Sequence, residues 1–192
     1  NPTFSKEIIY TYISDGGIQE EISLGAARIA GKLQLDNLIM FYDANEIQLS
    51  TETSDVMAED TGAKYRAMGW EVFEIDGNDV PQIRTAIEAA QKVVGKPTLI
   101  IGRCIMGKGA LQADGSSYER SCKTHGAPLG GDAYVNTVKN LGGDPENPFV
   151  IFDDVKEIYA KRAIELEAIA AERHAEEEEW AKANPEMAAK QT

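Results

Sequence analysis

The sequence predicts an α/β fold built on a parallel sheet with helices on both faces. Two observations support this. Short apolar runs rich in branched residues alternate with segments of helical period, which is the pattern of parallel strands joined by crossover helices. A length of 192 residues with 43% hydrophobic content is enough to bury one core. We therefore expect one compact domain as the main body of the chain.

The expected elements follow from the apolar runs and the turn formers between them. Strands are expected at 8–13, 38–42, 70–75 and 98–105, and helices at 18–33, 58–68 and 80–94. Residues 106–147 are rich in glycine and turn formers, and only 133–141 looks helical; a loop of this length in a compact domain indicates a functional or a disordered segment. Residues 153–190 are expected to form one or two helices, with Val155, Ile158, Tyr159, Leu166 and Ile169 on one face.

Charge and composition exclude several classes of function. Acidic residues outnumber basic ones by 32 to 19, so a net charge of -13 would repel a nucleic acid. No apolar run approaches the ~20 residues needed to cross a bilayer, and the amino terminus has no secretory leader pattern, so we expect a cytoplasmic protein without a membrane partner. Cys104 and Cys122 do not have metal-ligand spacing and are expected to be reduced thiols.

Candidate ligands for a phosphate-bound cation follow two neighbouring strands. Asp15 and Gly16 come directly after the first strand, and Asn45 follows the second strand 30 residues later. One right-handed crossover of that length would place the two side chains side by side at the carboxyl edge of the sheet. Mg²⁺ prefers oxygen ligands, and a carboxylate, an amide oxygen and a nearby backbone carbonyl, most simply that of Ile47, would serve.

The segment from Ser14-Asp15-Gly16 to Asn45 resembles the thiamine diphosphate motif, which opens with Gly-Asp-Gly and closes with Asn about thirty residues later. Ser14 replaces the first glycine of that triplet, and Glu21 stands where glycine is usual. The stretch Thr124-His125-Gly126-Ala127-Pro128-Leu129-Gly130 is similar to transketolases and not to the related synthases. The resemblance to transketolases covers roughly residues 10–185.

The resemblance implies both a function and a set of site residues. A transketolase moves a two-carbon ketol unit from a ketose phosphate to an aldose phosphate with thiamine diphosphate. Asp15, Asn45 and the carbonyl of Ile47 would hold Mg²⁺ or Ca²⁺, Gly16 would contact the diphosphate, and His125 would touch the cofactor and the donor sugar. Residues 1–150 would be the carboxy-terminal part of the diphosphate-binding domain, and 151–192 a helical extension towards the next domain.

The same resemblance implies partners and leaves alternatives. The glutamate that activates the cofactor's aminopyrimidine belongs to another domain, and the chain enters a buried strand almost at once, so we expect an upstream segment, a pyrimidine-binding domain and a homodimer of the complete enzyme. The chain alone should be inactive. The alternatives are another thiamine diphosphate enzyme, such as deoxyxylulose-phosphate synthase or a two-subunit dehydrogenase component, and a non-catalytic transketolase-like partner subunit.

Overall fold

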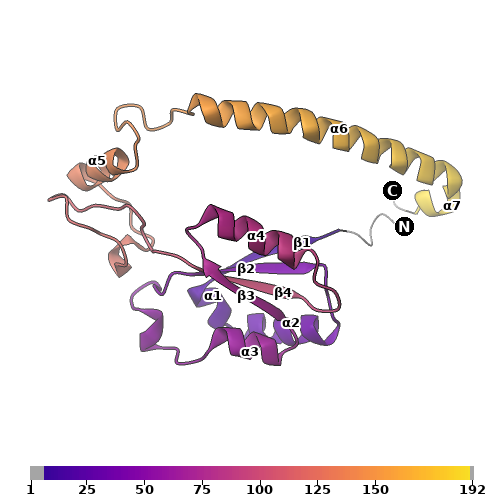
Figure 1. The fold of residues 1–192 in the computed structure, drawn as a ribbon, viewed down its shortest axis with the longest axis horizontal. Helices are drawn as coiled ribbons and strands as arrows, with labels where there is room; N and C mark the ends of the chain where they lie inside the picture. The colour runs from indigo at the N-terminus through magenta and orange to yellow at the C-terminus, as the bar shows by residue number, and fades with distance from the viewer. Residues whose placement is uncertain (1–6, 191–192) are drawn as a thin grey trace. The chain divides into compact units, whose positions relative to one another are not determined.

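The computed structural model describes residues 7–190 and confirms the α/β class. The chain divides into two units, one up to Pro145 and one from Glu146 onwards. The first unit contains a parallel sheet with the strand order β1-β2-β4-β3 (Figure 1). All three strand pairings are parallel, as crossover helices require.

The element boundaries are as follows. The strands are β1 (Ile9–Ser14), β2 (Leu38–Ala44), β3 (Glu71–Asp76) and β4 (Thr98–Arg103). The helices of the first unit are α1 (Asp15–Gln19), α2 (Glu21–Lys32), α3 (Thr61–Ala67), α4 (Val80–Ala90) and α5 (Gly131–Asn140), with short 3-10 turns η2 (Thr53–Asp55) and η3 (Cys122–Thr124). The second unit contains α6 (Asp153–Ala183) and α7 (Pro185–Ala188).

Helices cover both faces of the sheet at its central strands, and successive side chains of a strand point to opposite faces. In β2, Met40 and Tyr42 pack with side chains of α2 and α3, whereas Ile39 packs with α4 on the other face. Figure 1 shows α4 on one side of the sheet and α2 and α3 on the other. Central strand β4 is buried almost throughout, which explains its continuous apolar sequence.

Helix caps fix the starts of α3 and α4. The Asp60 side chain accepts a hydrogen bond from the Ala63 backbone N–H at 2.8 Å, so α3 begins at Thr61 and not at residue 58. The Asp79 carboxylate accepts from the Gln82 N–H at 3.1 Å and starts α4 where the sequence predicted. The carboxyl end of α4 lies at Ala90, before the predicted residue 94.

The prediction of a glycine turn followed by one helix was wrong. Asp15, Gly16 and Gly17 form the first turn of α1, so the helix begins at the carboxylate itself. The helical path breaks at Glu20, whose φ of -65° and ψ of 134° are extended, and α2 starts afresh at Glu21.

Strand β2 continues two residues past its predicted end. Asp43 and Ala44 pair with Gly102 and Arg103 of β4. The strand was expected to end at residue 42, and the structure instead makes Asp43 a half-buried residue of the strand. The strand β4 ends at Arg103, two residues before the predicted end.

The long loop after β4 is ordered by its own hydrogen bonds and by α5. The Glu119 carboxylate accepts from the Gly109 N–H at 2.8 Å, and the Thr137 hydroxyl accepts from the Leu111 N–H at 2.9 Å. The helix expected at 133–141 is α5, which begins two residues earlier. The loop therefore has a defined conformation and is not a linker.

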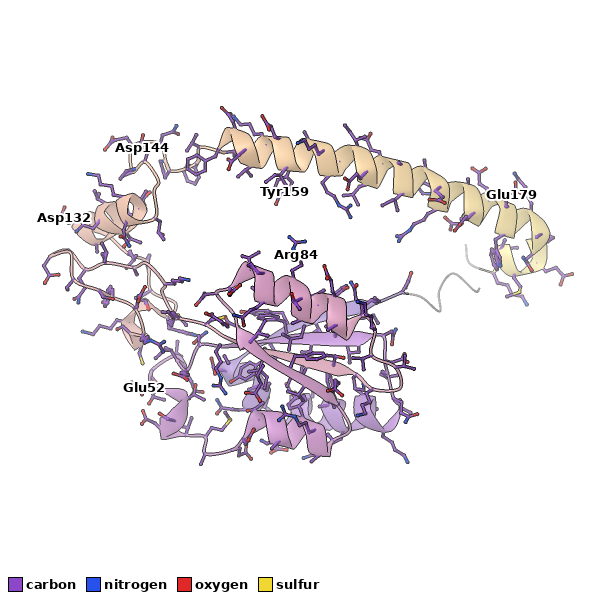
Figure 2. The ribbon with its side chains drawn as sticks, viewed as in Figure 1. Glu52, Arg84, Asp132, Asp144, Tyr159 and Glu179 are labelled. Carbon is purple, nitrogen blue, oxygen red and sulfur yellow. The ribbon has the colours of Figure 1, made fainter. Side chains whose placement is uncertain are left out.

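Helix α6 forms the body of the second unit and none of its residues is buried there. Ile158, Tyr159 and Ile164 are exposed, and Figure 2 shows side chains, Tyr159 and Glu179 among them, projecting outward along the helix. Among residues 7–190 no helix combines the length and the apolar character needed to span a bilayer.

Two glycines of α2 should respond oppositely to the same substitution. A Cβ on Gly31 would lie 1.8 Å from the Met68 carbonyl oxygen, whereas a Cβ on Gly25 would meet nothing within 4 Å. Gly31→Ala should lower the free energy of unfolding by about 1–3 kcal/mol despite alanine's higher helix propensity. Gly25→Ala, the matched control, should raise it by about 0.5–1 kcal/mol. Urea unfolding measures both, and equal effects would contradict the close packing of α2 against the turn before β3.

Candidate functional site

Asp15 lies at the carboxyl edge of the sheet and is 2% exposed. Its Oδ1 accepts a hydrogen bond from the Tyr42 hydroxyl at 2.6 Å, and its Oδ2 accepts from the Asn45 backbone N–H at 3.0 Å. One crossover brings Asp15 to Asn45, as predicted, but the contact is made by the backbone N–H of Asn45 and not by its side chain. The carboxylate thus joins the end of β1 to the segment that follows β2.

Asn45 and Ile47 form a tight turn beside this carboxylate. The Asn45 Oδ1 accepts from the Ile47 N–H at 3.1 Å, and the Asn45 Nδ2 donates to the Asp43 Oδ2 at 3.4 Å. These two bonds set the orientation of the amide, with its oxygen on the side of the Ile47 backbone. Glu46, between the two residues, has a left-handed backbone with φ of 68°.

The donor set suits a hard cation. Asp15 is buried, and neither Lys nor Arg forms an ion pair with it among residues 7–190. A buried carboxylate without a positive partner is costly, and a bound cation would remove that cost. Its two hydrogen bonds leave further lone pairs available, since an ionised carboxylate has about four acceptor sites.

A cation here could not depend on acidic side chains alone. In the described part of the chain no group of three or more His, Cys, Asp or Glu side chains could hold a metal. Amide and backbone oxygens, together with oxygens of a bound ligand, would have to complete the shell, as is common for Mg²⁺. Asn45, whose backbone N–H donates to Asp15, and Ile47, two residues further on, carry oxygens of these two kinds.

A cleft of about 440 Å³ opens beside Asp15. Its lining is strongly acidic, with Arg103 as its basic residue, and the acids are Asp15, Glu46, Glu52, Glu59, Asp60 and Glu74. A Cβ built on Gly16 would meet nothing within 4 Å, so the backbone of α1 faces open space at this point. An anion could approach that backbone, but in this lining it would need a cation as counter-charge.

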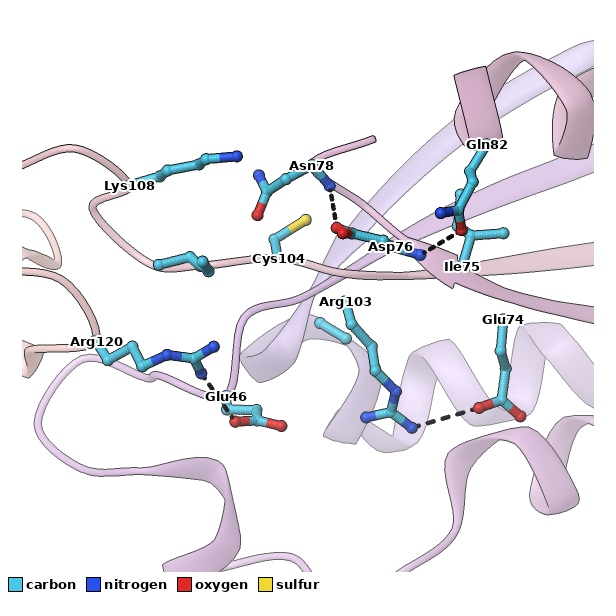
Figure 3. A pocket seen from close by; sticks show the side chains of 12 residues that line it. Glu46, Glu74, Ile75, Asp76, Asn78, Gln82, Arg103, Cys104, Lys108 and Arg120 are labelled. Atoms are coloured by element: carbon cyan, nitrogen blue, oxygen red, sulfur yellow. Dashed lines mark hydrogen bonds and ion pairs between the residues drawn. The ribbon is translucent and has the colours of Figure 1, made fainter. Parts of the chain in front are cut away.

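A second cleft, of about 520 Å³, lies at the ends of β3 and β4 (Figure 3). Arg103 pairs with Glu74 at 3.3 Å on one side of it, and Arg120 pairs with Glu46 at 3.5 Å on the other. Lys108 points into the cleft from the loop after β4.

His125 lies at the end of η3, in the loop that leads to α5. Its Nδ1 is buried and has no hydrogen-bond partner, while its backbone N–H donates to the Cys122 carbonyl at 3.1 Å. Among the described residues no hydrogen bond joins this side chain to the Asp15 network. The structure therefore brings Asp15, Gly16, Asn45 and Ile47 together, and His125 stays a separate prediction.

Residues 2–192 match the model of the transketolase thiamine diphosphate binding domain. The chain belongs to the transketolase family. It is 41% identical over 165 residues to the transketolase of Staphylococcus epidermidis, covering 82% of this chain and 24% of that protein. With the transketolase of Mycobacterium tuberculosis it shares 37% identity over 183 residues, which is 94% of this chain and 25% of the relative.

Solved transketolases share the fold of this family member. The transketolase of Pichia stipitis in complex with sedoheptulose 7-phosphate is 31% identical, with a TM-score of 0.88 over 98% of this chain and 28% of that chain. The Campylobacter jejuni transketolase gives a TM-score of 0.73 at 36% identity, covering 80% of this chain and 23% of that one. The chain spans about a quarter of the length of these relatives.

The departure from the family triplet at Ser14 has a simple explanation. Ser14 has φ of -106° and ψ of 176°, which is extended backbone that any residue adopts. The position does not need the left-handed conformation that favours glycine. The change at Ser14 therefore leaves the path from β1 into α1 intact.

Sequence reasoning missed two residues that order this transketolase-family site. Tyr42 holds Asp15, and Asp43 accepts from both Asn45 and the Tyr12 hydroxyl, the latter at 2.6 Å. A charged residue in a buried strand was the available signal for Asp43. No comparable signal marks Tyr42, because an aromatic residue at a buried strand position is ordinary core.

The electrostatics keep these supporting groups protonated. Burial, and then the hydrogen bond to Asp15, raises the pKa of Tyr42 above its ordinary value, so its hydroxyl remains a donor. Burial and the Tyr12 hydrogen bond with Asp43 raise the pKa of Tyr12 in the same way. Burial also raises the pKa of the Cys104 thiol to about 12, with the neighbouring Asp43 carboxylate as the next cause.

The Cys104 thiol should therefore resist alkylation. With a pKa of about 12, only about one thiol in 10⁴ is ionised at pH 8, and the thiolate is the reactive form. Asp43→Asn removes a negative charge beside the sulfur and should speed iodoacetamide labelling of Cys104 roughly tenfold, which corresponds to one pKa unit. Peptide mass spectrometry follows the rate at each cysteine. Fast labelling of Cys104 in the unmodified protein would contradict the raised pKa.

Proposed function

We propose that this chain provides the metal and diphosphate anchor of a transketolase, which transfers a two-carbon ketol unit from a ketose phosphate to an aldose phosphate. The observation that carries the proposal is the buried Asp15 carboxylate, which forms no ion pair with a basic side chain among residues 7–190 and lines an acidic cleft. Membership of the transketolase family supports the same conclusion.

In this proposal three residues hold the metal. The Asp15 carboxylate, the Asn45 Oδ1 and the Ile47 carbonyl would bind Mg²⁺ or Ca²⁺, and Gly16 would let the diphosphate approach the backbone of α1. The acidic lining of the cleft supports the metal requirement, because a diphosphate would otherwise face repulsion from several carboxylates. Tyr42 and Asp43 would keep Asp15 and Asn45 in place.

When bound, thiamine diphosphate supplies the carbon nucleophile that takes up and releases the two-carbon unit. The chain's own residues bind and orient it. We assign to His125 a hydrogen bond to the cofactor and to the donor sugar. Sugar phosphates are the proposed substrates, in line with the sedoheptulose 7-phosphate bound to the Pichia stipitis relative.

The proposed site is completed by other polypeptide. Edge strand β1 exposes Ile9, Tyr10 and Tyr12, an apolar surface suited to further protein. We assign it to the upstream part of the same enzyme, with the pyrimidine-binding domain beyond α6 and a homodimer as the complete form. In this division residues 1–150 belong to the diphosphate-binding domain and 151–192 lead to the next domain. The free thiols Cys104 and Cys122 support a cytoplasmic location.

Asp15→Asn should weaken cofactor binding in the complete enzyme while preserving the fold. The amide keeps the shape of the side chain but removes the charge that attracts the cation, so the Kd for thiamine diphosphate with Mg²⁺ should rise by at least about 100-fold. Calorimetry measures the Kd. Glu52→Gln, which removes an acid from the same cleft, is the control and should change the Kd less than about threefold. Equal effects of the two variants would remove Asp15 from the ligand set.

His125→Ala should lower turnover more than cofactor affinity. Loss of a hydrogen-bond donor at a developing oxyanion typically costs about 10²-fold in kcat. The measurement is a coupled assay of the complete enzyme with ketose and aldose phosphates, beside calorimetry for the cofactor. Unchanged kcat would make the loop structural only. A wild-type enzyme that binds cofactor without turnover would instead favour the non-catalytic alternative.

A further inference from the structure

Glu46 and Arg120 are unusual residues that contact each other. Both have left-handed backbones, with φ of 68° and 55°, and among residues 7–190 the third non-glycine residue with positive φ is Gln34. The Arg120 guanidinium lies 3.5 Å from the Glu46 carboxylate, 74 positions away in the chain. Figure 3 shows Arg120 reaching from its own loop to Glu46.

Glu46 belongs to the proposed metal turn. It stands between Asn45 and Ile47, and its left-handed backbone allows the Ile47 N–H to reach the Asn45 Oδ1. Glutamate rarely adopts this conformation, so surrounding contacts must maintain it. Its carboxylate pairs with the Arg120 guanidinium.

Arg120 belongs to the loop that carries His125. Its backbone N–H donates to the Met106 carbonyl at 2.9 Å, which joins the later part of the loop to its first residues after β4. His125 follows five positions later in the sequence. The other side-chain hydrogen bonds that the structure shows for residues 105–124 run within the loop or to α5.

We propose that the Glu46–Arg120 ion pair is a positioning contact that holds the His125 loop against the Asn45–Ile47 turn. The inference rests on the proposed function, because it assigns the contact to the two parts of a cofactor site. Neither residue is a cofactor ligand in this proposal. The pair acts by fixing the position of the loop relative to the turn, so that the cofactor can contact both when it binds.

The exposure of the pair limits the size of the effect. The Arg120 and Glu46 side chains are 57% and 62% exposed, and ion pairs of this kind are weak in water. Breaking the pair should therefore weaken cofactor affinity about two- to fivefold rather than abolish it. Lys108 lines the same cleft and lies in the same loop but forms no ion pair in the described structure, so it offers a matched control.

The test is a double-mutant cycle in the complete enzyme. Calorimetry gives the Kd for thiamine diphosphate with Mg²⁺ in wild type, Glu46→Gln, Arg120→Gln, the double variant and Lys108→Gln. If the pair acts as a unit, both single variants weaken binding by a similar factor and the double variant is no worse than either. Two independent charges would instead act in opposite directions on the anionic cofactor, with Glu46→Gln tightening its binding.

A second measurement needs no cofactor. Amide hydrogen exchange of residues 105–124 in the cofactor-free enzyme should accelerate in Glu46→Gln and Arg120→Gln and stay at the wild-type rate in Lys108→Gln. The inference is overturned if exchange is unchanged in both pair variants, if the losses of affinity add in the double variant, or if Lys108→Gln weakens binding as much as Arg120→Gln. A wild-type enzyme that binds no thiamine diphosphate would overturn the proposed function and this inference together, whereas normal binding in every variant would overturn the inference alone.

Discussion

The buried carboxylate of Asp15 is the constraint on which the rest of the site depends. Removed from water, it must be satisfied by groups that the fold brings to it, and these come from β2 and from the segment after β2. Tyr42 can donate only because β2 lies beside β1 in parallel register. Asp15 is also the first residue of α1, so β1, α1 and β2 meet at this side chain.

Other polar groups around this carboxylate fix the orientation of the Asn45 side chain beside it. Asp43, inside β2, accepts from Asn45 and Tyr12, and the Asn45 amide in turn accepts from the Ile47 N–H. Each group has a partner that limits its rotation, which is how a site holds ligands before they bind. Glu46, between Asn45 and Ile47, has a left-handed backbone, a conformation that costs on the order of 1–3 kcal/mol in a residue other than glycine.

Acidic charge sets the electrostatic character of the cleft beside Asp15. Its carboxylates would repel an anionic ligand, and a bound cation would offset that repulsion. The loop after β4 brings cations of its own, Lys108 and Arg120, to the neighbouring cleft. In that cleft the bases face the acids Glu46, Glu74 and Asp76, so its charges are balanced, whereas the cleft beside Asp15 is mainly acidic.

The sequence alone determined the α/β class, the parallel strands and the pairing of Asp15 with Asn45, because apolar periodicity and crossover length are local properties of the chain. The sequence did not determine where α1 begins, because the Asp15-Gly16-Gly17 segment suits a turn and a helix start equally well. It also did not determine that Asp43 belongs to β2, because pairing with β4 extends that strand. Tyr42 and the Glu46–Arg120 contact were also decided only by tertiary structure. Contacts between residues 27 and 74 positions apart depend on how strands and loops pack in space, and spacing along the chain carries no trace of them.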